Sequence, residues 1–227
     1  ITSSSLVRYS GCFSFKYQGL NYGVIGTTEG SNIFEITEDN KLREIDSVTG
    51  RYVSSQAITR GYARYGDFLY ATGDEGDASL QIIDLTSLPG SVSVAAEIQD
   101  DRVGKAHNIC IDSLNGILFL CSVKPIINGQ ESSLVPLRVF SLSNPLSPTL
   151  VFEGFNDLDE VHDIELREQI AILNCGFQGI RVYDFSDPSS PVYLNNLEFY
   201  QEQGYNHQGS LSEDAKTYVF ADETPGT

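Results

Sequence analysis

The sequence predicts an all-β protein, a β-propeller built from four-stranded antiparallel blades. Two observations predict it: a strand-and-turn motif recurs along the chain, and a second motif returns at intervals of 45 to 55 residues. A fixed period of this length is typical of radially repeated blades, which leave few unpaired sheet edges. No stretch sustains the 3.6-residue apolar period of a helix. We expect residues 1–227 to form a single propeller domain.

The first repeated motif is a short β-branched and aromatic run that ends in Asp or Ser and then in proline. Such a run predicts a strand followed by a turn, because proline cannot continue a hydrogen-bonded ladder. Its copies begin at Ile33, Leu80, Leu137 and Ile180. Asp84 and Asp184, with Glu35 as their counterpart, are predicted to cap the turns through bonds to backbone N–H groups two residues on.

The second motif is a strand, a turn and a strand that precede each copy of the first, and it supplies the two inner strands of a blade. Its clearest form is His107–Asp112, the turn Ser113–Gly116 and then Ile117–Cys121. An insertion, Lys124–Ser133, explains the one long interval. We expect the blades to start near the equivalent residues Cys12, Arg60, His107, His162 and His207.

The fifth repeat contains only two strands, so about five blades are visible and the last is incomplete. Two arrangements follow from this. In one, Leu6–Tyr9 supplies an outer strand that closes a five-bladed ring. In the other, the sequence is truncated at its C-terminus and a larger ring continues beyond Thr227.

Composition narrows the function classes. The net charge of -17 is spread along the chain, and such a field repels phosphate backbones, which disfavours nucleic acid as a partner. No apolar run reaches about 18 residues, so no transmembrane segment is expected. The cysteines lack CxxC spacing, which disfavours a zinc ribbon. We predict buried free thiols, with disulfides as the alternative, at Cys12, Cys110, Cys121 and Cys175.

At its repeated motifs the chain resembles the LVIVD-repeat proteins, and more closely the secreted, mostly bacterial group called choice-of-anchor B. The resemblance covers nearly the whole chain and is strongest from about Arg60 onward. It departs at Gly61, where an acidic residue is common, and at Ser210, where an aromatic residue is usual. It implies a propeller that is secreted or held at the cell surface, and no settled activity. The shared stretches are Leu80–Pro89, Ala106–Asp112, Val161–Leu166, Gly179–Pro191 and Tyr205–Glu223.

The three histidines of the protein occupy the same position in three consecutive repeats, at the start of the innermost strand. Inner strands of a propeller line its axial channel, so we expect the imidazoles at one channel mouth, with Arg60 at the matching place one blade earlier. A residue with a side-chain carbonyl or carboxylate oxygen follows each histidine. The predicted ligand-binding residues are therefore Arg60, His107, Asn108, His162, Asp163, His207 and Gln208.

Three interpretations of this rim are open. The side chains can form a structural network in which each histidine bonds an acceptor of a neighbouring blade. They can bind a small molecule or an anion, with Arg60 taking part. Or His107, His162 and His207 can hold a divalent transition metal such as Zn, Mn, Fe or Ni, because calcium prefers oxygen ligands alone.

Other sites have weaker support. The acidic loops Asp74–Asp77 and Asp157–Glu160 lack the ligand spacing of an EF-hand, so we interpret them as solvated loops rather than calcium sites. No GxSxG elbow, P-loop, GxGxxG or HExxH motif is present. The sequence thus favours a non-enzymatic extracellular module that binds a surface protein or a glycan at the channel mouth. The alternative is a metal-dependent hydrolase or lactonase-like enzyme that uses the same histidines.

Overall fold

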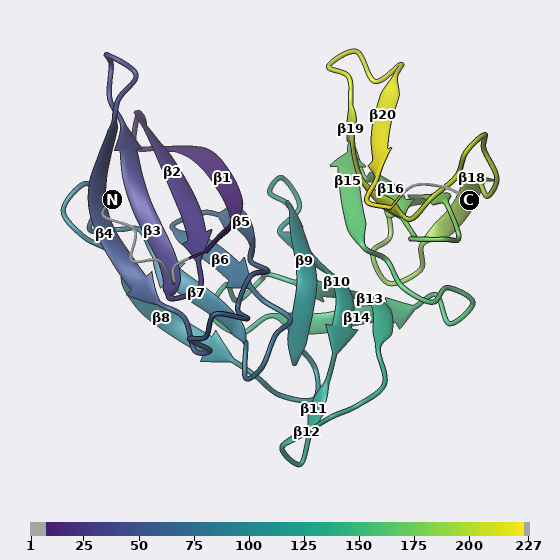
Figure 1. Ribbon diagram of the computed structural model, residues 1–227, viewed down its shortest axis with the longest axis horizontal. Helices are drawn as coiled ribbons and strands as arrows, with labels where there is room; N and C mark the ends of the chain where they lie inside the picture. Colours follow the sequence, from purple (N-terminus) through teal and green to yellow (C-terminus); the bar gives the residue numbers. More distant parts are fainter. Residues whose placement is uncertain (1–7, 225–227) are drawn as a thin grey trace. The chain divides into compact units, whose positions relative to one another are not determined.

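The computed structural model describes residues 8–224, and all regular structure in that part of the chain is β-strand (Figure 1). The strands form four antiparallel sheets of four strands each, followed by a two-stranded hairpin, with one further small hairpin inserted in the third sheet. This is the predicted fold class. Within residues 8–224 no helix is long and apolar enough to cross a bilayer.

The first two sheets each consist of consecutive strands in chain order. Their strands are β1 (Tyr9–Tyr17), β2 (Leu20–Thr27), β3 (Gly30–Ile36) and β4 (Leu42–Thr49), then β5 (Gly61–Tyr65), β6 (Phe68–Thr72), β7 (Leu80–Asp84) and β8 (Ser93–Ile98). Short turns join the strands of the first sheet and β5 to β6, whereas the longer segments 73–79 and 85–92 join β6 to β7 and β7 to β8.

The third sheet has the order β14-β13-β10-β9 and contains the insertion. The fourth sheet again follows chain order, and the last two strands form the hairpin. These strands are β9 (Lys105–Asp112), β10 (Ile117–Lys124), β11 (Ile126–Ile127), β12 (Gln130–Glu131), β13 (Val135–Ser141), β14 (Thr149–Gly154), β15 (Asp163–Arg167), β16 (Ile170–Asn174), β17 (Ile180–Asp184), β18 (Val192–Leu197), β19 (Asn206–Leu211) and β20 (Tyr218–Asp222).

The chain divides into two compact units. Unit 1 contains the chain up to His107 and residues 125–131, and unit 2 contains the rest, from Asn108 onward. The inserted hairpin β11–β12 therefore belongs to unit 1, whereas the strands β10 and β13 that flank it belong to unit 2. Its position between the second and third strands of the third sheet is the one predicted from the long repeat interval.

Each unit has its own apolar core between sheets. In unit 1, Val24 and Ile33 of the first sheet pack with Leu69 and Ile83 of the second, all of them inaccessible to solvent. A fully buried side chain of this size contributes about 1.5–3 kcal/mol relative to an exposed one. The core of unit 2 joins the third and fourth sheets through Phe119, Cys121, Leu137, Val139, Ala171, Leu173 and Phe185.

The innermost strands of neighbouring sheets lie against each other inside each unit. β1 contacts β5 in unit 1, and β15 contacts β19 in unit 2. First strands in contact are what a radial arrangement of blades requires. The predicted blade starts fall in or directly before these first strands, because Cys12 lies in β1, Arg60 precedes β5 and His162 precedes β15.

The predicted third strands and their turns are largely confirmed. The four copies of the motif form β3, β7, β13 and β17. The Asp84 carboxylate accepts bonds from the backbone N–H of Thr86 at 2.7 Å and from its hydroxyl at 2.6 Å, and Asp184 binds Ser186 at the same two distances. Glu35 departs from this role.

Glu35 pairs with Arg43 across the β3–β4 ladder instead of capping a turn. The reason is that β3 continues through Ile36, so the turn begins one residue later than the motif suggested. There Thr37 takes over, and its hydroxyl oxygen accepts the backbone N–H of Lys41 at 3.1 Å.

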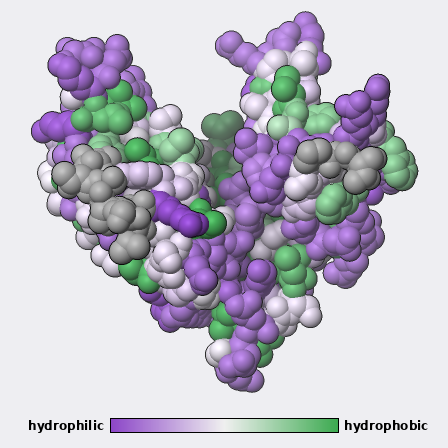
Figure 2. All heavy atoms as spheres, in the orientation of Figure 1, coloured by the Kyte–Doolittle hydropathy of each residue, from purple (hydrophilic) through white to green (hydrophobic). Residues whose placement is uncertain are grey.

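The N-terminal alternative for ring closure is wrong for Tyr9. This residue begins β1 and is paired with Thr27 of β2, so it belongs to an innermost strand and not to an outer one. Leu6 and Val7 lie outside the described residues. All four cysteines are free thiols, and Cys121 and Cys175 are buried as predicted. The predicted burial is wrong for Cys12, which is exposed on β1, and holds only in part for Cys110. Most of the surface drawn in Figure 2 is hydrophilic, in keeping with the high net charge.

Candidate functional site

One edge of unit 2 brings titratable and aromatic side chains from two sheets together. At this edge β15 begins, β16 ends and β17 begins, and beyond them β19 begins and β20 ends. We call it the His162 edge, and it is defined by Glu160, His162, Phe177, Tyr205, His207 and Glu223.

Backbone pairing fixes the positions of these residues. The N–H of His162 donates to the carbonyl of Asn174 at 2.7 Å, which extends the β15–β16 ladder by one residue. In the hairpin, the N–H of Glu223 donates to the carbonyl of Tyr205 at 2.9 Å. An isolated bridge between Gly176 and Asn206 ties the fourth sheet to the hairpin. The side chains at the edge are thus presented by a hydrogen-bonded frame.

A β-bulge places His207. In the β19–β20 register Asn206 opposes Asp222 and Gln208 opposes Ala221, so His207 is the extra residue between them. A bulge redirects a side chain and is frequent next to binding sites. Here it brings the His207 ring to the His162 ring, with centroids 4.5 Å apart.

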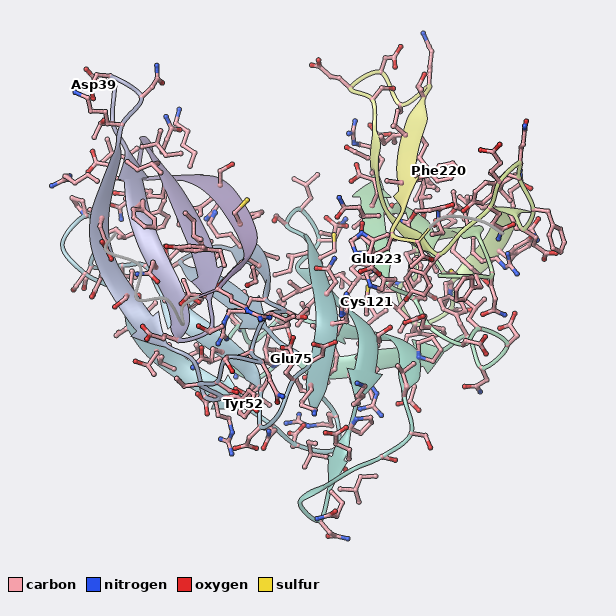
Figure 3. All side chains as sticks on the ribbon, viewed as in Figure 1. Asp39, Tyr52, Glu75, Cys121, Phe220 and Glu223 are labelled. Atoms are coloured by element: carbon pink, nitrogen blue, oxygen red, sulfur yellow. The ribbon has the colours of Figure 1, made fainter. Side chains whose placement is uncertain are left out.

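Three donor groups converge at this point. One ligand atom each from His162, His207 and Glu223 lie within 4.8 Å of one another. His162 is buried, His207 half-buried and Glu223 exposed, so the cluster opens to solvent on the hairpin side. Figure 3 labels Glu223 at the end of β20. Two imidazoles and a carboxylate can bind a borderline divalent metal or exchange protons with a ligand.

The protonation pattern of His162 follows from its partner. Its Nδ1 lies 3.0 Å from the carbonyl oxygen of His207, and a carbonyl can only accept a hydrogen bond. The proton of the neutral ring is therefore on Nδ1, which leaves the lone pair on Nε2. A metal ligand or a general base needs such a lone pair.

A second pair supports the ring of His162 from the side. The Tyr205 ring meets it edge-on with centroids 5.3 Å apart, and the Tyr205 hydroxyl donates to Glu160 at 2.5 Å. Burial, together with this bond to a carboxylate, raises the pKa of Tyr205 far above its usual range. Tyr205 thus stays neutral at any physiological pH and acts as a fixed donor.

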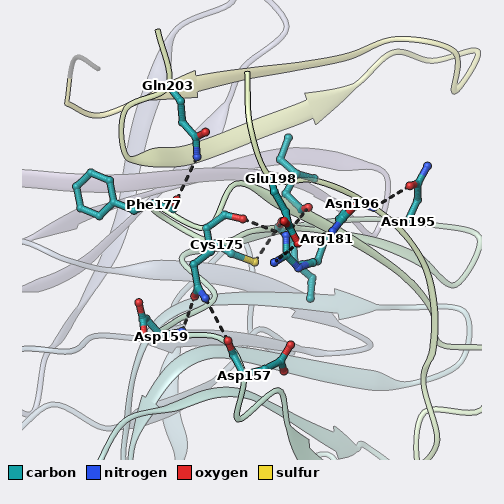
Figure 4. A network of polar contacts seen from close by, with 12 residues as sticks. Asp157, Asp159, Cys175, Phe177, Arg181, Asn195, Asn196, Glu198 and Gln203 are labelled. Atoms are coloured by element: carbon teal, nitrogen blue, oxygen red, sulfur yellow. Dashed lines mark hydrogen bonds and ion pairs between the residues drawn. The ribbon is translucent and has the colours of Figure 1, made fainter. Parts of the chain in front are cut away.

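Phe177 lies next to Tyr205 at this edge. It is 71% exposed, and its ring meets Tyr205 edge-on with centroids 5.2 Å apart. Its turn is held in place by hydrogen bonds: Gln178 accepts the N–H of Asp159 at 2.6 Å and donates to the carbonyl of Asp157 at 3.1 Å. Both aspartates are labelled in Figure 4. Gln203 donates to the carbonyl of Phe177 at 3.1 Å. An exposed aromatic on so constrained a turn is suited to contacting a ligand.

Arg60 of unit 1, which the sequence places at the position matching the histidines, forms hydrogen bonds to backbone carbonyls of the fold. Its Nε donates to the carbonyl of Thr27 at 2.7 Å and its Nη2 to the carbonyl of Tyr52 at 3.3 Å. It is only 9% exposed, and burial lowers the pKa of its guanidinium, while Tyr62 and Glu75 act in the opposite direction. Figure 3 labels Tyr52 and Glu75.

The remaining predicted residues have the following places. In unit 1, His107 Nδ1 lies 2.8 Å from a carboxylate oxygen of Asp74. In unit 2, the Asn108 amide donates to Asp163 at 2.6 Å. Gln208 is exposed on β19. The structure therefore brings together His162 with His207, and Asn108 with Asp163, and it places Arg60 and His107 near the Asp74–Asp77 loop of unit 1.

Residues at equivalent positions in successive repeats each bond a neighbouring sheet or hairpin, although the acceptors and directions differ. Arg60 bonds Thr27 of the preceding sheet, His107 bonds Asp74 between strands of the preceding sheet, and His162 bonds the backbone of His207 in the following hairpin. A blade-to-blade hydrogen-bond network, one of the interpretations of the sequence, describes these three contacts. In the acidic loop Asp74–Asp77, the carboxylate of Asp77 accepts hydrogen bonds from Arg51 and Gln99.

Glu223, Tyr205, Glu160 and Phe177 were missed from the sequence as site residues. A regular hairpin register centred on the Ser212–Thr217 turn would have placed Glu223 opposite Asn206, one residue away from Tyr205, which it faces in the structure. The bulge at His207, however, leaves no compositional sign, because no glycine or proline marks it. Phe177 lies in the turn between β16 and β17. The sequence pattern does not distinguish an aromatic residue that contacts a ligand there from any other exposed aromatic residue.

The sequence matches no protein-family model and no curated protein. Among solved structures, a functionally unknown protein from Desulfotomaculum acetoxidans is 14% identical, with a TM-score of 0.66 over 95% of this chain and 63% of that one. Raptor from Chaetomium thermophilum is 13% identical, with a TM-score of 0.65 over 97% of this chain and 19% of that one.

The periplasmic gluconolactonase of Pseudomonas aeruginosa is also 13% identical, with a TM-score of 0.58 over 90% of this chain and 58% of that one. The chain spans less than two thirds of the length of each of these proteins. At such identities the similarity concerns the fold alone. The structural neighbours are β-propellers, and the chain has the all-β, four-stranded blade architecture of that fold.

Proposed function

We propose that this chain acts as a binding module of a secreted or cell-surface β-propeller protein, with its ligand at the His162 edge. The observation that carries the proposal is Phe177, an exposed ring on a hydrogen-bonded turn, which contacts Tyr205 of the His162 edge. Rigid aromatic residues at the centre of a polar surface are frequent binding hot spots. The place outside the cell rests on the resemblance to choice-of-anchor B proteins.

Charge favours a surface protein with a basic patch as the partner. Asp157, Asp159 and Glu160 lie on the segment that holds the Phe177 turn, and the whole chain carries a net charge of -17. Such a field accelerates the approach of a cationic surface and repels an anionic one. A neutral glycan is the other ligand class that the sequence suggested. Arg60, His107, Asn108, Asp163 and Gln208 stay predictions as ligand contacts.

A peptide-display experiment tests this proposal. A phage library rich in Lys and Arg is selected against the immobilised chain, and the selected peptides are measured against wild type, Phe177→Ser and Leu114→Ser. Leu114 is 96% exposed in the turn between β9 and β10 and serves as the matched control. We expect Phe177→Ser to weaken binding about ten-fold or more, and added salt to weaken it further.

Equal binding by Phe177→Ser and wild type would remove the basis of the proposal. A glycan array probed with the same three proteins covers the other ligand class. Glycan binding that depends on Phe177, with no salt-sensitive peptide binding, would replace the protein partner by a glycan while keeping the binding edge.

A hydrolase, with lactones as the first substrates to try, is a second candidate. Two imidazoles and a carboxylate are a donor set that catalytic metal sites use while leaving one coordination position for water. One structural neighbour is a gluconolactonase, although the similarity to it is one of fold. Hydrolysis of a sugar lactone is measured by pH-stat titration. If this candidate is right, His207→Asn abolishes that hydrolysis. Hydrolysis at the rate of buffer alone would reject it for that substrate class.

A further inference from the structure

The geometry points to a mononuclear site for a divalent transition metal, with Zn²⁺ as the best match, ligated by His162, His207 and Glu223. This differs from the set of three histidines suggested by the sequence, because Glu223 takes the place of His107. It deepens the proposed function, since it assigns a ligand to the same edge.

The first argument is the convergence of donors. The three ligand atoms lie within 4.8 Å of one another. Ligand atoms that are each about 2.1 Å from one tetrahedral ion lie about 3.4 Å from one another, so binding needs a closure of up to about 1.4 Å. The exposed Glu223 side chain can supply that closure by rotation about its own bonds, without movement of the strands.

The second argument is the orientation of His162. In metal sites a ligating histidine donates its other ring N–H to a carbonyl or carboxylate, which fixes its tautomer and its angle. Here Nδ1–H donates to the carbonyl of His207, so the neutral ring would coordinate through Nε2. His207 therefore orients His162 through its backbone carbonyl and offers its own imidazole as the second ligand.

The third argument is the layer behind the ligands. Tyr205 packs edge-on against His162, is held by Glu160, and accepts through its carbonyl the N–H of Glu223. A single tyrosine thus contacts one ligand through its ring and another through its backbone. Such outer-layer support restricts the ligands before any ion is bound.

The fourth argument is the choice of metal. Nitrogen donors from two imidazoles disfavour Ca²⁺ and Mg²⁺, which take oxygen ligands. One carboxylate and the acidic surroundings favour a divalent cation over an anion. Zn²⁺ accepts this mixed set readily, and Co²⁺ reproduces its geometry with a visible spectrum.

The test uses the full chain, purified without a metal-affinity column and treated with a chelator. Calorimetric titration with ZnCl₂ is expected to show one ion per chain, and CoCl₂ to give the strong visible bands of a four- or five-coordinate ion. His207→Asn and Glu223→Gln are each expected to weaken Zn²⁺ binding by about ten-fold or more.

Two variants serve as controls. His107→Asn removes a histidine of unit 1 that pairs with Asp74, and Glu213→Gln removes an exposed carboxylate of the same hairpin. Both are expected to keep the wild-type Zn²⁺ affinity. Circular dichroism checks the fold of every variant, and if His207→Asn fails to fold, the exposed Glu223→Gln decides the result alone.

The inference is overturned if Glu223→Gln binds Zn²⁺ like wild type, if His107→Asn weakens binding as much as the cluster variants do, or if Co²⁺ shows only the weak bands of a hexahydrated ion. Peptide binding through Phe177, measured in the presence of a chelator, is independent of these outcomes. If the chain binds Zn²⁺ but no peptide through Phe177, the proposed function is wrong and the metal site stands. If it binds peptide through Phe177 but no Zn²⁺, the metal site is wrong and the proposed function stands.

Discussion

The Nε atom of Arg60 lies 2.7 Å from the carbonyl oxygen of Thr27 and donates to it from the second sheet to the first. The Arg60 side chain occupies space that two glycines leave open, since a Cβ on Gly50 would lie 2.5 Å from Arg60 Nη2 and one on Gly26 3.0 Å from Arg60 Cβ. Arg60 was predicted as a ligand residue, and these contacts also give it a structural role.

Replacement of Arg60 by Met is expected to destabilise the protein by about 2–4 kcal/mol. The substitution keeps most of the apolar stem but leaves the carbonyls of Thr27 and Tyr52 without their donor, and buried unsatisfied groups cost about 1–3 kcal/mol each. Urea unfolding followed by circular dichroism measures the change. Arg43→Met is the control, because Arg43 pairs with Glu35 at an exposed surface and should cost under about 1 kcal/mol. Equal effects of the two substitutions would contradict the structural role.

Glu75 is expected to make the stability of unit 1 depend on pH. Burial is the main cause that raises its pKa, and the neighbouring carboxylate of Asp74 adds to the rise. The unfolded chain therefore loses this proton at a lower pH than the folded one. Between the two pKa values stability falls as the pH rises, and above both the loss is complete.

Glu75→Gln removes this penalty and keeps an acceptor for the N–H of Ile58. We expect the variant to gain stability over wild type as the pH rises from about 4 to 7.5, by less than about 1 kcal/mol because the group is only partly buried. Urea midpoints at several pH values measure it, with the exposed Glu38→Gln as the control. A constant difference between variant and wild type across this range would show that Glu75 is not the group responsible.

Tyr218 is expected to anchor the hairpin β19–β20 to the fourth sheet. Its hydroxyl lies 2.8 Å from Nδ2 and 3.1 Å from Oδ1 of Asn174, whose side chain is fully buried. Tyr218→Phe leaves that amide without its partner, at a cost of about 1–3 kcal/mol. Hydrogen exchange should accelerate in β19 and β20 and stay unchanged in β1–β4. Unchanged exchange in the hairpin would show that other contacts hold it.

The sequence supplied the periodic part of this structure. The four third strands and the turns at Asp84 and Asp184 follow local rules, since β-branched runs favour strands and Asp binds backbone N–H groups two residues on. Glu35 broke the pattern because β3 continues one residue beyond it, through Ile36. The sequence also placed His107, His162 and His207 at equivalent repeat positions, and the structure brings His162 and His207 together.

The composition of the site could not be predicted in the same way. Glu223 joins the two histidines only because a bulge shifts the β19–β20 register by one residue, and the sequence around His207 carries no mark of that bulge. Tyr205 and Glu160 meet across 45 residues of chain through one hydrogen bond. Contacts of this kind depend on how sheets pack, which local propensity does not encode.

The cysteines allow a last prediction that separates burial from reactivity. Burial raises the pKa of Cys110 and of Cys175 to about 12, and it raises that of Cys121 as well. Thiolate is the reactive form, so these three thiols are expected to resist alkylation in the folded protein at pH 8, whereas the exposed Cys12 reacts. Iodoacetamide labelling followed by peptide mass spectrometry should show modification at Cys12 alone, and at all four cysteines in urea. Labelling of Cys121 without denaturant, at a rate like that of Cys12, would mean that the packing between the third and fourth sheets opens in solution, because Cys121 belongs to that core.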